Sequence, residues 1–159
     1  MRLKRTYSSR EVAALTGLTV RQLQLWDASG LVVAVIQPHR TAAGGFTERR
    51  YTPIELFELL VLADLRRRGF TVQQLHDILD TLKSQFGARL FDATGGSGRL
   101  QLLTDGRDLY ARTDRGEFFN LLQSPTQPLL VVGNEGMLKE LSGKVRARRA
   151  AKPSGSGQA

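Results

Sequence analysis

Apolar residues recur at helical spacing in four segments of the first half of the chain. Each segment follows the same start signal, a Ser or Thr with Glu or Gln three residues later. In this capping-box pattern, side chains satisfy the free N–H groups of a helix's first turn. The four pairs are Ser8–Glu11, Thr19–Gln22, Thr52–Glu55 and Thr71–Gln74. They predict helices over about residues 9–15, 20–29, 53–68 and 72–86.

The first two helices are separated by a turn centred on Gly17, a spacing typical of a helix-turn-helix. In the second helix we expect Val20 and Leu23 to face inward, with Trp26 on the same buried side. Outward-facing Arg and Gln side chains contact phosphates and read base edges in the major groove. The candidate DNA contacts here are Thr19, Arg21, Gln22 and Gln24. The alternative is an ordinary solvated helix face.

A Val-rich apolar run over residues 31–36 is followed by a loop and by a return over residues 46–51. Two such short strands after a helix-turn-helix predict a wing. Its candidate DNA contacts are Arg40, Arg49, Arg50 and Tyr51. Two alternatives stay open, since Tyr51 also suits the core and the loop around Arg40 also suits plain exposure.

The pattern changes in the second half of the chain. Residues 87–98 end in a glycine-rich stretch and predict a linker. Asp105-Gly106 predicts a two-residue turn between strands over 100–104 and 107–112. Beyond it we expect a helix from Thr113 or Asp114 to residue 122, a strand over 129–132 and a helix over 135–141.

These elements predict an α+β protein with a DNA-binding domain over residues 1–86. A linker over 87–98 leads to a small α/β domain over 99–142, built of hairpin, helix, strand and helix. Gly, Ser, Pro, Ala and basic residues predict a disordered tail over 143–159.

Charge supports a polyanionic partner, because the formal net charge is +8. The excess is +3 over residues 1–80, zero over 81–142 and +5 over 143–159.

The chain has no cysteine and two histidines, which excludes thiolate metal sites and predicts no metal and no cofactor. Catalytic arrangements of Ser, His and Asp are missing, so we expect no enzyme. No apolar stretch is long enough for a membrane span, and no signal peptide is evident, so a cytoplasmic location is the default.

From Tyr7 to about Leu79 the sequence resembles the MerR family of transcriptional regulators. The matching motifs are Glu11-Val12-Ala13, Thr16-Gly17-Leu18-Thr19-Val20-Arg21-Gln22-Leu23, Gly30-Leu31-Val32, Arg49-Arg50-Tyr51-Thr52 and Arg68-Gly69-Phe70-Thr71. The resemblance implies a winged helix-turn-helix bound as a homodimer to a near-palindromic site in promoter DNA. It also implies RNA polymerase as a partner.

A narrower resemblance is to a short actinobacterial-type subgroup with a small, strand-containing C-terminal domain. It is carried by Arg21-Gln22-Leu23 with Trp26, and by Leu103-Thr104-Asp105-Gly106, Leu109-Tyr110 and Phe118 to Leu122. Gln24-Leu25-Trp26 stands where many family members have Arg-Tyr-Tyr, so operator sequence does not transfer.

The long dimerising coiled coil common in the family is missing or shortened in this sequence. Dimerisation then falls to the fourth helix, to the C-terminal unit, or to both. The candidate residues on the fourth helix are Leu75, Ile78, Leu79, Leu82 and Phe86.

The sequence therefore predicts a homodimeric, sequence-specific transcriptional regulator acting on promoter DNA. Two alternatives remain: a ligand-sensing or protein-interaction module delivered by a DNA-binding head, and an architectural or excisionase-like DNA bender.

Overall fold

The four predicted helices are present in a computed structural model that describes residues 2–95, 98–130 and 135–151. They are α1 (Ser9–Thr16), α2 (Val20–Ala28), α3 (Pro53–Arg67) and α4 (Val72–Phe86). All four capping boxes form, with both reciprocal hydrogen bonds in each. The chain divides into two compact units, Met1–Pro128 and Leu129–Ala159, and each is described by itself.

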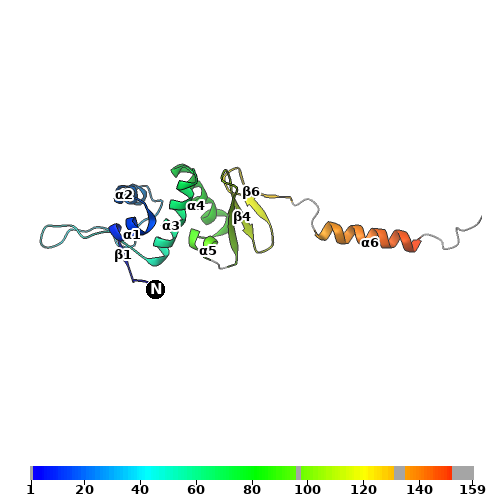
Figure 1. Ribbon diagram of the computed structural model, residues 1–159, viewed down its shortest axis with the longest axis horizontal. Coiled ribbons are helices and arrows are strands. Elements are labelled where there is room, and N and C mark those ends of the chain that lie inside the picture. Colours follow the sequence, from blue (N-terminus) through cyan, green and yellow to red (C-terminus); the bar gives the residue numbers. More distant parts are fainter. Residues whose placement is uncertain (1, 96–97, 131–134, 152–159) are drawn as a thin grey trace, which may run out of the picture. The chain divides into compact units, whose positions relative to one another are not determined.

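All four helices (Figure 1) contribute buried side chains to the core of the first unit, among them Val12 of α1, Leu23 of α2, Leu59 of α3 and Leu75 of α4. Leu23 and Trp26 of α2 are buried, which confirms the predicted inward face of this helix. Val20 departs from that prediction, because 37% of its surface is exposed. It is the first residue of α2, before the helix has turned toward the core.

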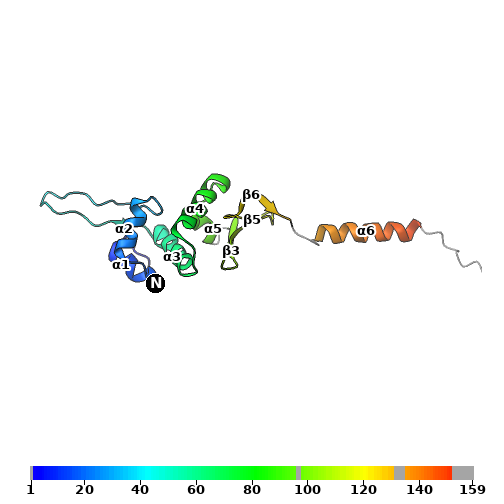
Figure 2. The same cartoon turned by 90° about the horizontal axis from the view of Figure 1, so that it is seen from above.

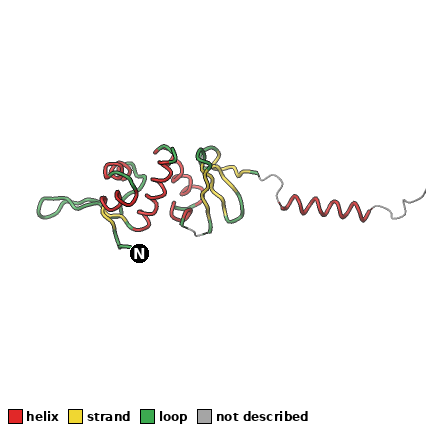
Figure 3. The backbone as a smooth tube through the Cα atoms, in the orientation of Figure 1, coloured by secondary structure: helices red, strands yellow, loops and turns green. Residues whose placement is uncertain are grey.

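The wing extends from the helices as two long arms that are mostly loop, as Figures 2 and 3 show. The prediction of two regular strands was wrong. Only β2 (Arg50–Tyr51) forms, with isolated bridges joining Ile36 to Arg50 and Arg40 to Phe46. Leu31, Val32 and Ala34 are drawn into the core, so this segment does not alternate as a strand would. Instead β2 pairs with β1 (Tyr7–Ser8), a strand that the sequence did not reveal.

The segment predicted as a linker contains a short helix, α5 (Leu90–Thr94). Leu90 and Ala93 are buried in the common core. The guanidinium of Arg89 donates hydrogen bonds to the buried carboxylate of Glu58 on α3, and this carboxylate raises the pKa of Arg89. Gly96 and Ser97 lie outside the described residues.

A four-stranded antiparallel sheet follows, in the order β3 (Leu100–Thr104), β4 (Leu109–Thr113), β5 (Phe118–Asn120) and β6 (Ser124–Leu129). The predicted hairpin is confirmed as β3 and β4, but its loop is longer than two residues. The Asp105 carboxylate accepts backbone hydrogen bonds from Asp108 at 2.8 Å and Arg107 at 2.9 Å. These bonds lower the pKa of Asp105 and fix the longer loop.

The predicted helix over about 114–122 was wrong, because β5 occupies its centre. Gly116 adopts a left-handed φ of 81°, and the Thr113 N–H donates to the Glu117 carbonyl at 2.8 Å. Together they close a turn between β4 and β5. Phe119 then points inward and meets Phe86 edge-to-face, with ring centroids 5.3 Å apart. The C-terminal part is therefore an antiparallel sheet rather than the expected α/β arrangement.

β6 takes the place of the strand expected over 129–132, of which residues 131 and 132 lie outside the described residues. In the second unit, the predicted helix over 135–141 is longer, since α6 runs from Glu135 to Ala151. Residues 143–151, expected in a disordered tail, are thus helical; Ala, Lys and Arg favour helix strongly. The predicted domain boundaries stay a prediction. None of the described helices is long and apolar enough to cross a membrane.

Candidate nucleic-acid interface

The turn between α1 and α2 is held by three hydrogen bonds. Gly17 adopts a left-handed φ of 78° and donates its N–H to the Ala13 carbonyl. The buried Thr16 hydroxyl donates to the Val12 carbonyl at 2.7 Å and accepts from the Leu18 N–H at 3.2 Å. These bonds fix the angle at which α2 leaves the turn.

Arg67, at the end of α3, reaches across to this turn. Its Nη1 donates to the Thr16 carbonyl at 3.2 Å. Sequence reasoning missed this bridging role. No sequence signal marks it, because the two residues are far apart in the chain.

The exposed face of α2 carries Arg21 and Gln24, as predicted, and also Leu25, with 55% of its surface exposed. Sequence reasoning missed Leu25 as a candidate contact, although an exposed apolar side chain can touch a thymine methyl group. Thr19 and Gln22 cap the helix, each accepting the other's backbone N–H at 3.0 and 2.9 Å. The exposed side chains of Arg21, Gln24 and Leu25 on this face therefore make no hydrogen bond or ion pair among the described residues.

Asp27 joins α2 to the wing. Its buried Oδ2 accepts hydrogen bonds from the Ala34 N–H and from Gln37 Nε2, both at 2.9 Å. Its other oxygen, Oδ1, lies 3.7 Å from Arg49 Nε. The sequence did not single out this carboxylate, because its partners lie along an irregular segment.

The two arginines at the base of the wing are partly engaged in holding it. Arg50 Nε donates to the Thr6 hydroxyl at 2.8 Å. Arg49 faces Asp27, and its side chain is 24% exposed. In contrast, Arg40 near the wing tip is exposed.

Tyr51 is fully buried and fits the core alternative rather than surface contact. Within the described residues its hydroxyl has no hydrogen-bond partner of ordinary geometry. Burial, and after it the charge of Asp27, raise the pKa of this phenol.

The five candidate dimer residues on α4 fall into two groups. Leu75, Ile78 and Leu82 are completely buried inside this chain's own core. Leu79 and Phe86 are partly buried and pack against that core. Only these two keep surface that a second protomer could reach.

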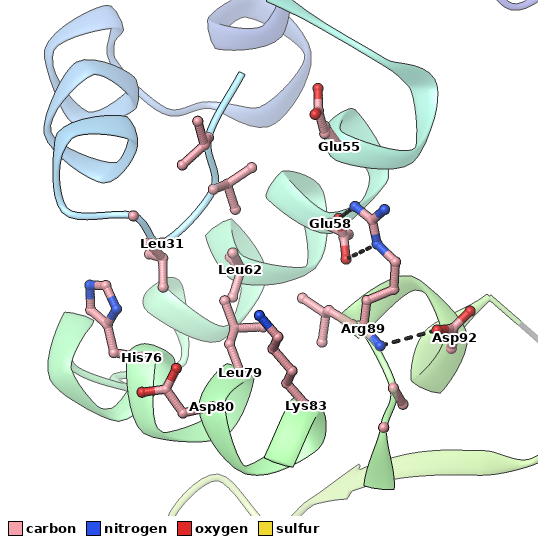
Figure 4. Close-up of a pocket in the computed structure, with 16 residues that line it drawn as sticks. Leu31, Glu55, Glu58, Leu62, His76, Leu79, Asp80, Lys83, Arg89 and Asp92 are labelled. Atoms are coloured by element: carbon pink, nitrogen blue, oxygen red, sulfur yellow. Dashed lines mark hydrogen bonds and ion pairs between the residues drawn. The ribbon is translucent and has the colours of Figure 1, made fainter. Parts of the chain in front are cut away.

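A cleft of about 580 Å³ is lined by residues 30–33, which follow α2, and by residues of α3, α4 and α5 (Figure 4). Its apolar wall includes Leu31, Leu62 and Leu79. His76, Asp80 and Lys83 line the α4 side, and within the described ranges their side chains make no hydrogen bond or ion pair. The Arg89–Glu58 pair closes the opposite side (Figure 4).

Comparison with known proteins gives a match to a family model and matches to individual relatives. Residues 7–82 match the model of the MerR HTH family regulatory protein. Uncharacterized HTH-type transcriptional regulators of Mycobacterium bovis and Mycobacterium tuberculosis are 27% identical over 139 residues. The match covers 87% of this chain but 57% of the relatives, so the chain spans little more than half their length.

These matches confirm the resemblance found in the sequence over the N-terminal part of the chain. The helix-turn-helix of α1 and α2 and the wing fall within the matched range. Residues 7–82 are thus similar to the MerR HTH family of regulatory proteins, and most of the chain is similar to relatives named as HTH-type transcriptional regulators.

Proposed function

We propose that this chain binds promoter DNA sequence-specifically as a homodimer, with α2 in the major groove and the wing on flanking DNA. The observation that carries the proposal is the exposed face of α2. Arg21, Gln24 and Leu25 are free there, while Leu23 and Trp26 anchor the helix from behind. A major groove admits such a helix and distinguishes all four base pairs by hydrogen bonds and methyl contacts.

In this proposal the wing supplies phosphate contacts. Arg40 is fully available, whereas Arg49 and Arg50 present the part of each guanidinium that Asp27 and Thr6 leave free. Phosphate contacts position a protein without carrying sequence information. Variants of these arginines should therefore weaken binding to all sequences alike.

The test begins with genome-wide mapping of bound sites, which gives the operator and the half-site spacing. Binding of full-length protein to that duplex is then measured by fluorescence anisotropy at fixed salt. We expect Arg21→Ala and Gln24→Ala each to weaken specific binding roughly tenfold and to relax preference at one base pair. Arg107→Ala and Gln85→Ala, exposed substitutions outside α2 and the wing, serve as controls.

Retention of full sequence-specific binding by both α2 variants would show that α2 is not the recognition helix. Binding that is weakened equally for every sequence would instead assign these side chains to phosphates.

For the homodimer, we propose that α6 contributes the interface. Leu141 and Val145 lie one helical turn apart and expose 57% and 41% of their surfaces. Residues four apart lie on one helix face, so a second copy of α6 can cover both. The partly buried Leu79 and Phe86 of α4 are the alternative contact.

A ligand-sensing role is the second candidate function, favoured by the cleft in Figure 4. Its size falls within the roughly 300–1,000 Å³ of small-molecule sites. Asp80 and Lys83 carry opposite charges beside an apolar wall, which suits a zwitterionic ligand with an apolar body. A thermal-shift screen of zwitterionic metabolites tests this role. A stabilising compound whose effect is lost in both Asp80→Ala and Lys83→Ala would support it, and a screen without any shift would count against it.

A further inference from the structure

Phe46 stands out among the apolar side chains of the wing, because 74% of its surface is exposed. A phenyl ring contributes nothing to the core at this exposure, and single exposed apolar residues need no explanation by themselves. Its surroundings make this one different. The backbone on both sides of Phe46 is fixed, and an arginine lies directly opposite.

Hydrogen bonds on either side hold the Phe46 backbone in place. Toward the tip, the Thr41 N–H donates to the Gly45 carbonyl at 2.7 Å, and the Thr41 hydroxyl donates to the same carbonyl at 3.0 Å. Toward the base, the Thr47 N–H donates to the His39 carbonyl at 2.9 Å. The Thr47 hydroxyl also bonds the His39 ring at 2.9 Å. Phe46 is therefore exposed on a hairpin end that hydrogen bonds hold in place.

The register of this hairpin end pairs Phe46 with Arg40. The flanking hydrogen bonds join Thr41 to Gly45 and Thr47 to His39, so the pair between them is not itself hydrogen-bonded. In antiparallel strands such a pair brings its two side chains closest, on the same face. The register thus places Arg40 and Phe46 opposite each other on one face of the wing end.

We propose that Phe46 inserts as an apolar wedge between base pairs in the minor groove, with Arg40 in the groove beside it. Proteins that kink DNA from the minor groove combine these two parts: a basic side chain that reads the groove and an apolar side chain that unstacks a base step. The wing as a whole is basic, with Arg40, Arg49 and Arg50 against Glu48, which suits a polyanion.

This inference rests on the proposed DNA-binding function and adds a mechanism to it. The cost of unstacking depends on sequence, since pyrimidine–purine steps open most easily. Phe46 would therefore select flanking steps by their deformability rather than by hydrogen bonds.

The test uses full-length protein and the mapped operator with 2-aminopurine placed at each flanking position in turn. The fluorescence of this base rises when it is unstacked. We expect wild-type protein to brighten one flanking step in each half-site. Phe46→Leu should keep part of the signal, whereas Phe46→Ala should abolish it and weaken binding roughly tenfold. Leu103→Ala, an exposed apolar substitution on β3, is the matched control. Thermal melts check that each variant is folded.

The outcomes separate the wedge from DNA binding itself. If wild-type protein binds the operator but no step brightens, or if Phe46→Ala brightens the same step, the wedge is overturned while the assignment of α2 stands. Normal DNA binding by Phe46→Ala with loss of transcriptional output would assign Phe46 to a protein partner and also overturn the wedge. Failure of wild-type protein to bind any duplex would overturn both proposals.

Discussion

The backbone N–H of Ala34 donates a 2.9 Å hydrogen bond to the carboxylate of Asp27, tying the entry to the wing to the end of α2. The same oxygen accepts from Gln37, and Arg49 approaches the other from the returning arm. One buried carboxylate therefore contacts both arms of the wing. Together with the Arg50–Thr6 hydrogen bond and the pairing of β1 with β2, this side chain holds the wing against α2.

Asp27→Asn should destabilise the protein and weaken DNA binding. The new amide places donor hydrogens against neighbours that are themselves donors, which costs about 1–3 kcal/mol when buried. We expect the melting temperature to fall by about 3 °C or more, with a several-fold loss of operator affinity. Asp77→Asn is the control, because Asp77 is an exposed α4 carboxylate that bonds only Gln73 among the described residues. Equal melting and equal binding of Asp27→Asn and wild type would contradict the role assigned to Asp27.

Tyr51→Phe should stabilise the protein while leaving DNA binding within about twofold. The substitution removes a buried hydroxyl that makes no ordinary hydrogen bond within the described chain, and such orphan groups cost about 1 kcal/mol or more. Tyr7→Phe is the matched control, since the Tyr7 hydroxyl accepts a hydrogen bond from the Lys4 N–H at 3.0 Å. Urea unfolding and anisotropy measure the two effects. A large loss of DNA affinity in Tyr51→Phe would return this residue to the DNA contacts.

The pH dependence of stability should reveal the raised pKa of Tyr51. Burial raises this pKa above the ordinary value of 10.0, so the native state keeps its proton at a pH where the unfolded chain loses it. Stability from this group is complete below the unfolded pKa and is lost as pH rises toward the folded pKa. Above pH 10.0 the free energy of unfolding should fall more steeply in wild type than in Tyr51→Phe. Tyr110 titrates in both proteins and cancels in the difference, and parallel curves would contradict the assignment.

Gly17→Ala should impair both stability and DNA binding. A left-handed backbone costs a residue with a Cβ atom about 1–2 kcal/mol, and φ at Gly17 is 78°. Relief of that strain would rotate α2 relative to α1. Gly87→Ala is a sharp control, because Gly87 ends α4 with a φ of 59° away from the turn. Both variants should melt earlier, but only Gly17→Ala should lose operator affinity.

Leu141→Asp combined with Val145→Asp should convert the proposed dimer to monomers in sedimentation velocity experiments. A charge at each position places carboxylates in an apolar contact, where they are strongly disfavoured. Leu79→Asp tests the alternative contact on α4. Dimers that survive the α6 variant but dissociate in Leu79→Asp would move the interface to α4.

The N-terminal helices could be predicted because each begins at a sequence signal that can be recognised locally. Capping boxes are local signals, and the apolar spacing that follows them is local as well. Of the eight predicted DNA contacts, Arg21, Gln24 and Arg40 are exposed with free side chains, whereas Tyr51 is buried. The sequence could not decide between burial and exposure of Tyr51, because Tyr51 pairs with Tyr7 of β1, which is far away in the chain.

The sheet was harder to predict for a related physical reason. Residues around Asp114 were predicted to start a helix, whereas they form a turn that Gly116 closes and that brings Phe119 against Phe86. Asp27 was missed because a buried carboxylate at the end of a helix is indistinguishable by sequence from a solvated one. In each case a long-range contact overrides a local preference.

The four capping boxes also have a kinetic consequence. Each box stabilises the first turn of its helix through hydrogen bonds between residues only three positions apart. Formation of the first turn, which is the unfavourable step of helix formation, is therefore favoured before long-range contacts form. Folding of the N-terminal helices should therefore be fast and driven by neighbours in sequence, whereas β1 and β2 must wait for the ends of a long loop to meet. Helix α2 should therefore form early, and the wing should be the last part of this region to assemble.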